Sequence, residues 1–359
     1  MQHIHTAFKL NGCSYNKEEL KVKAQQFSIS TLIFEQYIGL FLLEWLSDKS
    51  KIEVQSSGST GVPKKILLKK QHMVNSAVAT GAFFQLMPNS TVLHCLPSNF
   101  IAGKMMLVRA LHLGFSIDCI EPSSKPLNNI LKRYDFSAMV PLQVQNSIEK
   151  LSQIKTLIVG GTPMSYQLKK RLVACNTKVY ETYGMTETCT HIALKKIENK
   201  SIANDQFVTI DNVHVTMDKR DCLVINAPAI SDITIVTNDI VALHSSQAFT
   251  WLGRYDNVIN SGGVKLFPEQ IEKIIAKYFT QSFLIAGLPD EQLGQKLAFI
   301  VEGDTTILET QKKLQTINEL GKFQIPKEIV FLPVFARTAN GKVQRAKTLE
   351  MVVKDLNLE

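Results

Sequence analysis

Several common sequence signals are missing from this chain of 359 residues. Its six cysteines form no C-x-x-C pair and show no metal-ligand spacing with histidine, so free or buried thiols in a reducing compartment are the simplest explanation. No basic-then-apolar signal opens the chain, and apolar runs such as Ile38–Leu43 are too short to span a membrane. Internal repeats and low-complexity tracts are also absent. We therefore expect a cytoplasmic protein.

Strong charge is missing as well. The 40 basic and 32 acidic residues give a formal net charge of +8, and lysines occur only in short doublets such as Lys64-Lys65. Because no patch interleaves aromatic and basic side chains, anionic small molecules are favoured over nucleic acid as partners. The length accommodates about two or three domains.

The most informative segment that is present is polar. Residues 56–66 read Ser-Ser-Gly-Ser-Thr-Gly-Val-Pro-Lys-Lys-Ile. Hydroxyls and open backbone N–H groups bind phosphate oxygens, and lysine neutralises their charge. A Walker loop is disfavoured because Pro63 stands where that motif requires glycine. The segment favours phosphate binding by a different nucleotide chemistry, with a plain Ser/Gly-rich turn as the alternative.

Short apolar runs alternate with helical patterns after two expected helices at 28–46 and 69–87. The expected strands are Val92–Leu96, Ser116–Ile120, Ala138–Val140, Thr156–Val159 and Lys178–Thr182. This alternation predicts an α/β fold with a largely parallel sheet, whose ligands bind at the carboxyl ends of the strands. The loops Gly160–Pro163 and Tyr183–Glu187 follow two of these strands, so we expect the active site there.

Later residues indicate a change of architecture. Residues 207–251 predict an antiparallel β-subdomain of short strands, including Ile233–Thr237 and Ile240–Leu243. A small α+β module with its own core follows from about Asp256. We expect a large N-terminal domain at 1–255, with its β-subdomain at about 207–252, and a small C-terminal domain at 256–359.

Four motifs follow one another along the chain. They are Ser57–Lys64, Tyr183–Glu187, Asn238-Asp239 with Gly253–Asp256 and Ser261–Lys265, and Arg337–Arg345. Together they resemble the adenylate-forming superfamily of acyl-CoA ligases, nonribosomal adenylation domains and luciferases. The resemblance implies that a carboxylate attacks the α-phosphate of Mg·ATP, giving an acyl-adenylate and pyrophosphate. A thiol, usually that of coenzyme A, then displaces AMP in a site shielded from water.

The resemblance also assigns roles by motif position. The expected phosphate-binding residues are Ser57, Ser59, Thr60 and Lys64. Thr186 is expected to hydrogen-bond the α-phosphate, and Glu187 to help hold Mg²⁺ through its carboxylate. The remaining expected ATP-binding residues are Gly160, Gly161, Thr162, Tyr183, Gly184, Asp239 and Arg254. Of these, Tyr183 would offer its ring to adenine and Asp239 would accept from the ribose hydroxyls.

The C-terminal module carries the remaining expected residues. Lys342 would stabilise the charge that develops at the α-phosphate during adenylation. Asp256 matches the family's hinge position, and rotation there would bring Gly262 and Gly263 to the acyl site beside the pantetheine arm. A simple β-turn is the alternative for the two glycines, and a solvated lysine is the alternative for Lys342.

Two departures from the family pattern stand out. Most members carry a longer segment ahead of the phosphate loop, so we expect the first subdomain to be trimmed and its sheet to be partly missing or capped by residues 1–50. In addition, Ala336 replaces the usual proline before the Lys342 motif, which changes loop stiffness rather than chemistry.

The segment Leu96–Leu111 resembles the family's pocket-lining segment and is most similar to that of o-succinylbenzoate–CoA ligases of menaquinone synthesis. Phe100, where that segment often has histidine, and Gly103 would line the acyl pocket. Because o-succinylbenzoate is a dianion, one carboxylate needs a buried cation. We assign this role to Lys104 first and Arg109 second, with an exposed helix lysine as the alternative for Lys104.

The expected function is that of an AMP-forming acid–thiol ligase with ATP, Mg²⁺ and coenzyme A, and o-succinylbenzoate is the expected acid. Another aryl or fatty acid, or a carrier-protein thiol as acceptor, are enzymatic alternatives. A degenerate protein that binds AMP or an acyl-adenylate without turnover is the non-enzymatic one. The expected partners are the acid and coenzyme A, and a homodimer is left open.

Overall fold

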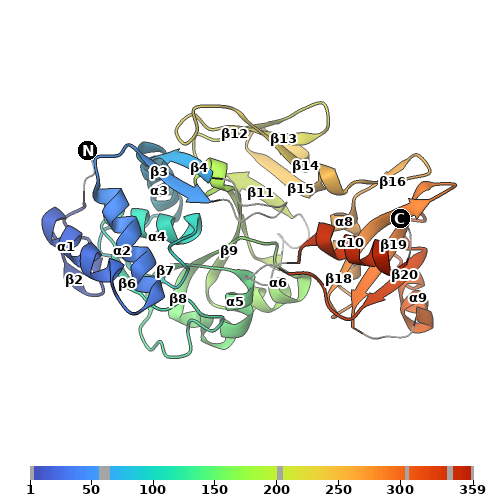
Figure 1. The fold of residues 1–359 in the computed structure, drawn as a ribbon, viewed down its shortest axis with the longest axis horizontal. Helices are drawn as coiled ribbons and strands as arrows, with labels where there is room; N and C mark the ends of the chain where they lie inside the picture. The colour runs from blue at the N-terminus through green and yellow to red at the C-terminus, as the bar shows by residue number, and fades with distance from the viewer. Residues whose placement is uncertain (1–3, 56–64, 200–204, 304–306, 338–342, 357–359) are drawn as a thin grey trace.

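The computed structural model describes residues 4–55, 65–199, 205–303, 307–337 and 343–356 (Figure 1). Within these ranges the strands form sheets of thirteen, five and two strands. The predicted residues Ser57, Ser59, Thr60, Lys64 and Lys342 lie outside the described residues.

The thirteen-stranded sheet has a parallel half and an antiparallel half. The parallel half runs in the spatial order β9 (Lys178–Gly184), β8 (Ile154–Val159), β7 (Tyr134–Met139), β5 (Thr91–His94), β6 (Ser116–Cys119) and β1 (Lys9–Leu10). The antiparallel β2 (Cys13–Ser14) closes its edge. The α/β fold with a largely parallel sheet is confirmed, and residues 9–14 extend that sheet beside β6.

The antiparallel half continues from β9 without a break. It runs through β10 (His191–Lys196), β11 (Gln206–Thr209), β15 (Ala248–Arg254), β14 (Ile235–Ser245), β13 (Cys222–Asn226) and β12 (His214–Met217). The prediction of separate strands at Ile233–Thr237 and Ile240–Leu243 was wrong. Asn238 and Asp239 do not form a turn there, because β14 pairs with β13 at Val236 and at Ile240, and Asp239 pairs with Arg254 of β15.

Helices cover both faces of the parallel half (Figure 1). One face packs against α3 (Lys70–Phe84) and α4 (Ile101–Leu113), and the other against α5 (Pro141–Ser147) and α6 (Tyr166–Val173). Strand β8 shows why both faces are covered, because Ile158 lies in one core and Leu157 and Val159 lie in the other.

The predicted helix 28–46 is α2 (Ile33–Leu46), which begins at Ile33 rather than at residue 28, and α1 (Lys17–Ser28) precedes it as a helix that was not predicted. An Asn16–Glu19 capping box starts α1. The two helices cross at Gly39, where a Cβ atom would lie only 2.4 Å from the Ser28 nitrogen. The glycine therefore permits the close crossing of α1 and α2.

The C-terminal residues build a smaller sheet at one end of the long axis (Figure 1). Its strands are β16 (Ile259–Ser261), β17 (Val264–Leu266), β18 (Phe283–Asp290), β19 (Gly294–Glu302) and β20 (Glu328–Leu332). It is accompanied by α8 (Pro268–Ile275), α9 (Ile307–Gln315) and α10 (Arg345–Asp355). We call residues 259–355 the small module. It has its own hydrophobic cores, one of them around Phe299 and Ile271.

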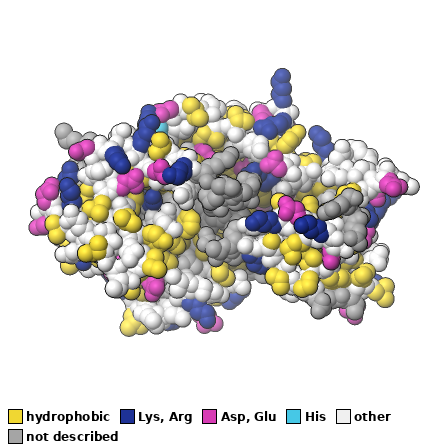
Figure 2. All heavy atoms as spheres, viewed as in Figure 1, with side chains coloured by type: hydrophobic (Ala, Val, Ile, Leu, Met, Phe, Trp, Pro, Cys, Tyr) yellow, Lys and Arg dark blue, Asp and Glu magenta, His cyan; other side chains and the backbone are white. Residues whose placement is uncertain are grey.

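Within the described ranges, none of the helices is long and apolar enough to cross a bilayer. All six cysteines lie in these ranges as free thiols. Figure 2 shows Lys and Arg side chains scattered over the visible face rather than gathered into one patch.

Candidate active site

The two strands of the smallest sheet flank the polar segment 56–64 in the sequence. Strand β3 (Lys51–Gln55) pairs with β4 (Lys65–Lys69), and Gln55 lies opposite Lys65. The short helix η2 (Thr186–Thr188), which carries two predicted site residues, lies beside β4. The fold therefore places β4, which follows the predicted phosphate segment in the sequence, next to the helix that carries Thr186 and Glu187.

The glycine pair after β8 lies against the end of β9. A Cβ atom at Gly160 would lie 2.2 Å from the Thr182 hydroxyl oxygen, and Gly161 has φ +88°. Only glycine meets both requirements without displacing the neighbouring strand. Because β8 and β9 are parallel neighbours, the segment Gly160–Thr162 and Tyr183 come together at one edge of the sheet.

Tyr183 and Gly184 are the last residues of β9 rather than part of a loop, so the prediction of a loop beginning at Tyr183 was wrong. The strand continues because Gly184 pairs with His191 of β10, a strand that was not predicted. Thr186 is half-buried and Glu187 is exposed. The Glu187 carboxylate is thus accessible beyond the end of the sheet.

Asp239 is the centre of a buried hydrogen-bond network. The Tyr183 hydroxyl donates to one carboxylate oxygen at 2.7 Å, and the Trp251 indole nitrogen donates to the other at 3.2 Å. The Arg254 Nε atom lies 3.8 Å from the latter oxygen. Burial, together with the nearby Asp239 charge, raises the pKa of Tyr183 well above its usual value, so its hydroxyl stays a donor. The predicted residues Tyr183, Asp239 and Arg254 are therefore in contact.

The Tyr183 ring is partly covered by aromatic neighbours. Its centroid lies 5.1 Å from that of Phe249, edge to face, and 5.9 Å from that of Phe207. Neither neighbour was predicted as a site residue. Phe207 lies on β11, a strand that was not predicted. They fix the orientation of the ring that is expected to meet adenine.

The predicted hinge follows directly on β15. Asp256 lies in the short helix η3 (Tyr255–Asn257), within 3.2 Å of Arg254 Nη2 and 3.3 Å of the Asn238 amide nitrogen. Gly262 and Gly263 form the two-residue turn of the β16–β17 hairpin, with φ +58° and +83°. That hairpin lies on the far side of the small module from β9 in Figure 1, so the structure does not bring these glycines to the site.

Arg109 is a buried cation near the Tyr183–Glu187 motif. It is 1% exposed, and no carboxylate of the described residues lies within ion-pair distance of its guanidinium. Its polar contacts are the Thr190 hydroxyl at 3.4 Å from Nη2 and the Met106 sulfur at 3.7 Å from Nη1, and its buried Nε has no partner. Burial lowers the pKa of Arg109 to about 10, so it remains charged at neutral pH.

Thr190 connects Arg109 to the Tyr183–Glu187 motif. The Thr188 hydroxyl donates to the Thr190 carbonyl at 2.7 Å, and a Cβ atom at Gly184 would lie 2.3 Å from the same oxygen. His191 follows, with its Nε2 atom 3.3 Å from the Thr80 hydroxyl oxygen. We call Arg109, Thr190, His191 and Thr80 the Arg109 region. Sequence reasoning missed its last three members, although Thr190 and His191 follow the motif closely.

Lys104 occupies another side of α4. It is 9% exposed, so the alternative of an exposed helix lysine is wrong. Its ammonium group donates to the Glu53 carbonyl at 3.2 Å and lies 5.6 Å from the Phe41 ring centroid. Burial lowers the pKa of Lys104 despite the nearby Glu44 and Glu53. The two predicted pocket cations therefore have separate surroundings.

The other two predicted pocket residues lie at the start of α4. Phe100 is the half-buried N-cap, and a Cβ atom at Gly103 would lie 2.3 Å from the Pro97 carbonyl oxygen. Glycine therefore lets the 97–100 turn fold back onto the helix. The turn also contains Ser98, whose hydroxyl lies 2.8 Å from His94 Nε2.

Within the described ranges no group of three His, Cys, Asp or Glu side chains could hold a metal ion. An exposed carboxylate such as Glu187 nevertheless suits Mg²⁺, which usually binds one or two carboxylates and substrate phosphates.

Comparison with known proteins adds sequence and fold similarity. The family model described as AMP-binding enzyme matches residues 55–215. The chain is similar to a 2-succinylbenzoate–CoA ligase of Listeria monocytogenes, with 26% identity over 356 residues that cover 91% of this chain and 76% of that protein.

Two solved structures are also similar. One is an acyl-CoA synthetase (AMP-forming)/AMP-acid ligase II-like protein of Dyadobacter fermentans, with TM-score 0.61, 32% identity, and coverage of 92% of this chain and 98% of that chain. The other is o-succinylbenzoate CoA synthetase of Bacillus subtilis in complex with its acyl-adenylate intermediate, with TM-score 0.72 and 18% identity. It covers 82% of this chain and 68% of that chain, and at this identity it shows the fold alone.

Proposed function

The chain belongs to the AMP-binding, adenylate-forming enzyme family, and we propose that it is an AMP-forming acid–thiol ligase. A carboxylate oxygen attacks the α-phosphorus of ATP, and pyrophosphate leaves. The sulfur of coenzyme A then attacks the acyl carbon, AMP leaves with the bonding electrons, and the thiol proton goes to solvent. The contact of Tyr183, Asp239 and Arg254 at the end of β9 supports a nucleotide site there.

Each residue has a role in this proposal. Gly160–Thr162 and Tyr183 bind the base, and both Asp239 oxygens accept from ribose hydroxyls in addition to their present donors. Thr186 orients the α-phosphate. Glu187 would hold Mg²⁺, which supplies charge neutralisation at the phosphates when bound. Ser57, Ser59, Thr60 and Lys64 would bind the outer phosphates, and Lys342 would donate to the α-phosphate.

We propose o-succinylbenzoate as the acid, which would place the enzyme in menaquinone synthesis. The observation that carries this proposal is the buried Arg109 guanidinium, which contacts the Thr190 hydroxyl shortly after the Tyr183–Glu187 motif. An unpaired buried charge is costly, and a carboxylate of the substrate would compensate it by charge-assisted hydrogen bonds. Arg109 now replaces Lys104 as our first choice, because Lys104 already donates to a carbonyl on another side of α4.

The proposal keeps the expected domain organisation, with residues 256–359 as a lid that turns at Asp256. Rotation would withdraw Lys342 and bring Gly262 and Gly263 to the acyl group. We also propose a cytoplasmic location, which fits six free thiols.

The test is acid-dependent release of pyrophosphate, measured with o-succinylbenzoate, benzoate and medium-chain fatty acids, each with and without coenzyme A. Release with o-succinylbenzoate, followed by AMP and thioester formation with coenzyme A, is the expected result. Preference for a monocarboxylate would reject the substrate but keep the reaction. Pyrophosphate exchange without thioester would indicate a carrier-protein thiol, and no release with any acid would leave only a binding protein.

A further inference from the structure

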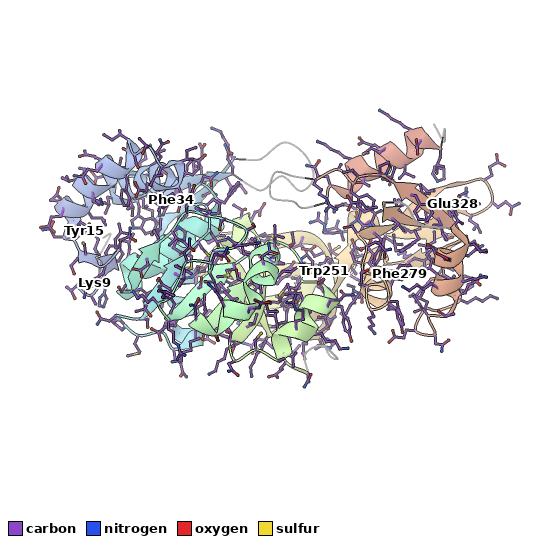
Figure 3. The ribbon with its side chains drawn as sticks, turned by 90° about the horizontal axis from the view of Figure 1, so that it is seen from below. Lys9, Tyr15, Phe34, Trp251, Phe279 and Glu328 are labelled. Atoms are coloured by element: carbon purple, nitrogen blue, oxygen red, sulfur yellow. The ribbon has the colours of Figure 1, made fainter. Side chains whose placement is uncertain are left out.

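Helix α8 of the small module is docked on the large sheet. The Gln270 amide donates to the Leu252 carbonyl at 2.8 Å and to the Trp251 carbonyl at 3.2 Å. From the other side, the Gln167 amide of α6 donates to the Ala276 carbonyl at the end of α8. Figure 3 shows Trp251 and Phe279 on the two sides of this junction.

Beneath this contact lies a group of charges that the proposed reaction does not use. Lys195 Nζ lies 2.8 Å from Glu181 Oε2 and also pairs with Asp205, and Lys169 Nζ lies 2.8 Å from the same Glu181 oxygen. We call Glu181, Lys195, Lys169 and Asp205 the buried charge cluster. Burial opposes the charged form of each member. The lysines nevertheless hold the pKa of Glu181 and Asp205 below their usual values, so both carboxylates are ionised at neutral pH.

Lys273 of α8 completes this cluster from the small module. Its Nζ atom lies 2.6 Å from Asp205 Oδ2. The Asp205 side chain is 16% exposed and that of Lys273 is 40% exposed, so the pair closes the outer side of the cluster. Because Lys273 lies beyond the predicted hinge at Asp256, this ion pair must break whenever the small module turns away.

The inner end of the cluster reaches the nucleotide site. Glu181 Oε1 accepts from the Met164 backbone nitrogen at 3.0 Å, directly after the segment Gly160–Pro163. Glu181 also lies two residues before Tyr183 on β9. The contacts from Lys273 through Asp205, Lys195 and Glu181 to Met164 thus join α8 to both parts of the proposed adenine site.

The same helix also holds the start of α10. The carboxylate of Glu272, next to Lys273, accepts from Arg345 Nη2 at 2.5 Å. Arg345 follows Lys342 by three residues. Figure 1 shows the Arg345 end of α10 turned toward the large sheet, while β16 lies on the far side. Docking through Lys273 therefore holds the α10 start, rather than the Gly262-Gly263 turn, toward the site.

We propose that Lys273 is a positioning residue whose ion pair with Asp205 holds the small module in the arrangement used for adenylation. This inference rests on the proposed function. Lys273 touches no reacting atom and acts by placing α8 and the α10 start. Because thioester formation requires the module to turn, loss of the pair slows the first half-reaction and leaves the second unchanged or faster.

The experiment compares Lys273→Met and Lys273→Arg with a matched control, Lys296→Met. Lys296 pairs with Glu328 at 2.9 Å inside the small module, so its loss removes a similar ion pair without touching the junction. Acyl-adenylate formation is followed as pyrophosphate release in a single turnover. Thioester formation is followed separately, from added o-succinylbenzoyl-adenylate and coenzyme A.

For Lys273→Met we expect about a tenfold slower adenylation, corresponding to about 1.4 kcal/mol, with an undiminished thioester step. Lys273→Arg restores most of the loss, and Lys296→Met changes neither step. Equal loss in both steps, or no loss in either, would overturn the inference.

A second measurement does not depend on activity. Small-angle X-ray scattering should show a larger radius of gyration for Lys273→Met than for the wild type or Lys296→Met. If the wild-type protein released no pyrophosphate with any acid, the proposed function would fail, and this comparison would still decide whether the pair holds the module. Identical scattering from all three proteins would reject the positioning role.

Discussion

Two regions of buried charge lie at opposite ends of β10, and they differ in how their cations are compensated. At one end, Arg109 contacts a hydroxyl and a thioether, beside a His191 whose pKa is kept well below its usual value by burial and by the Arg109 charge. At the other end, Lys195 is buried, but Glu181 and Asp205 raise its pKa above the usual value. The Arg109 region has no carboxylate partner among the described residues, whereas the buried charge cluster contains the carboxylates of Glu181 and Asp205.

This difference separates binding from positioning. A buried cation with a carboxylate partner serves the fold, since removing either partner leaves an uncompensated charge. A buried cation with neither a carboxylate nor a carbonyl partner lowers stability and is a candidate for binding a ligand that brings the anion. The comparison therefore assigns the Arg109 region to the substrate and the buried charge cluster to the placement of the small module.

The largest effect on stability is expected from Glu181→Gln. The substitution removes the buried carboxylate nearest to both Lys169 and Lys195 and leaves them only Asp205, so the free energy of unfolding should fall by about 4 kcal/mol. Urea unfolding followed by circular dichroism measures the loss. The matched control is Glu198→Gln, because Glu198 pairs with Lys196 at the surface, and its effect should stay within about 0.5 kcal/mol. Equal losses for both variants would remove the distinction between the buried and the exposed pair.

Arg109→Met should give the opposite result. Replacing a buried cation that lacks a carboxylate with an apolar side chain should leave the free energy of unfolding unchanged or raise it. The kcat/KM for o-succinylbenzoate should fall about a hundredfold, corresponding to about 2.7 kcal/mol, through a higher KM, while activation of a monocarboxylate changes little.

Lys104→Met is the matched control on the same helix. It removes a hydrogen bond to the Glu53 carbonyl, so stability should fall by about 1 kcal/mol with the acid preference retained. If Lys104→Met rather than Arg109→Met abolished the preference for the dicarboxylate, the original assignment to Lys104 would hold and the present one would be wrong.

Low pH should destabilise the Arg109 region and the buried charge cluster in different pH ranges. The folded pKa of His191 lies well below 6.5, so the unfolded chain binds the proton first, and stability is lost as pH falls below about 6.5. One such proton costs up to about 1.4 kcal/mol per pH unit. Glu181 and Asp205 have lowered pKa values, so their contribution persists until pH falls below the ordinary carboxyl values of 4.5 and 3.8.

Hydrogen exchange followed by mass spectrometry measures this difference by region. Between pH 6.5 and 5, after correction for intrinsic rates, peptides from α3, α4 and the start of β10 should lose protection, while those from α6 and α8 keep it. His191→Gln should remove part of the difference, because burial also lowers the pKa of His94, beside the start of α4, to about 4. Uniform loss over both regions would show that one global transition governs the acid response.

Much of the proposed nucleotide site could be predicted from the sequence, because its residues lie in short motifs at strand ends. Tyr183 comes from one motif and Asp239 and Arg254 from the next, and the three side chains lie close together. The buried charge cluster could not be predicted, since its members lie on separate elements and β10 carries no clear strand pattern. In the sequence, Lys195 stands in the doublet Lys195-Lys196, which looks like two surface lysines, but only Lys196 is exposed and Lys195 is buried.

The acyl side shows a different limit of sequence reasoning. All nine residues from Gly103 to Leu111 of α4 are buried, so the helix has no polar face that would mark an outer side. Lys104 and Arg109 are both charged, and the sequence pattern does not show which of them faces the Tyr183–Glu187 motif. Only the packing of α4 between α2, α3 and the sheet distinguishes them.

The smallest effect is expected from thiol modification, which probes whether the Arg109 region is closed in the free protein. Cys189 lies between Thr188 and Thr190, and burial raises the pKa of its thiol to about 12. Iodoacetamide at pH 8 should therefore label the exposed Cys13 quickly and leave Cys189 unmodified, with no change in stability. Peptide mapping gives the site of labelling. Early labelling of Cys189 that o-succinylbenzoate suppresses would mean that the Arg109 region is accessible to solvent in the free protein and closes when the acid binds. The desolvation of Arg109 would then reduce the stability of the bound state only.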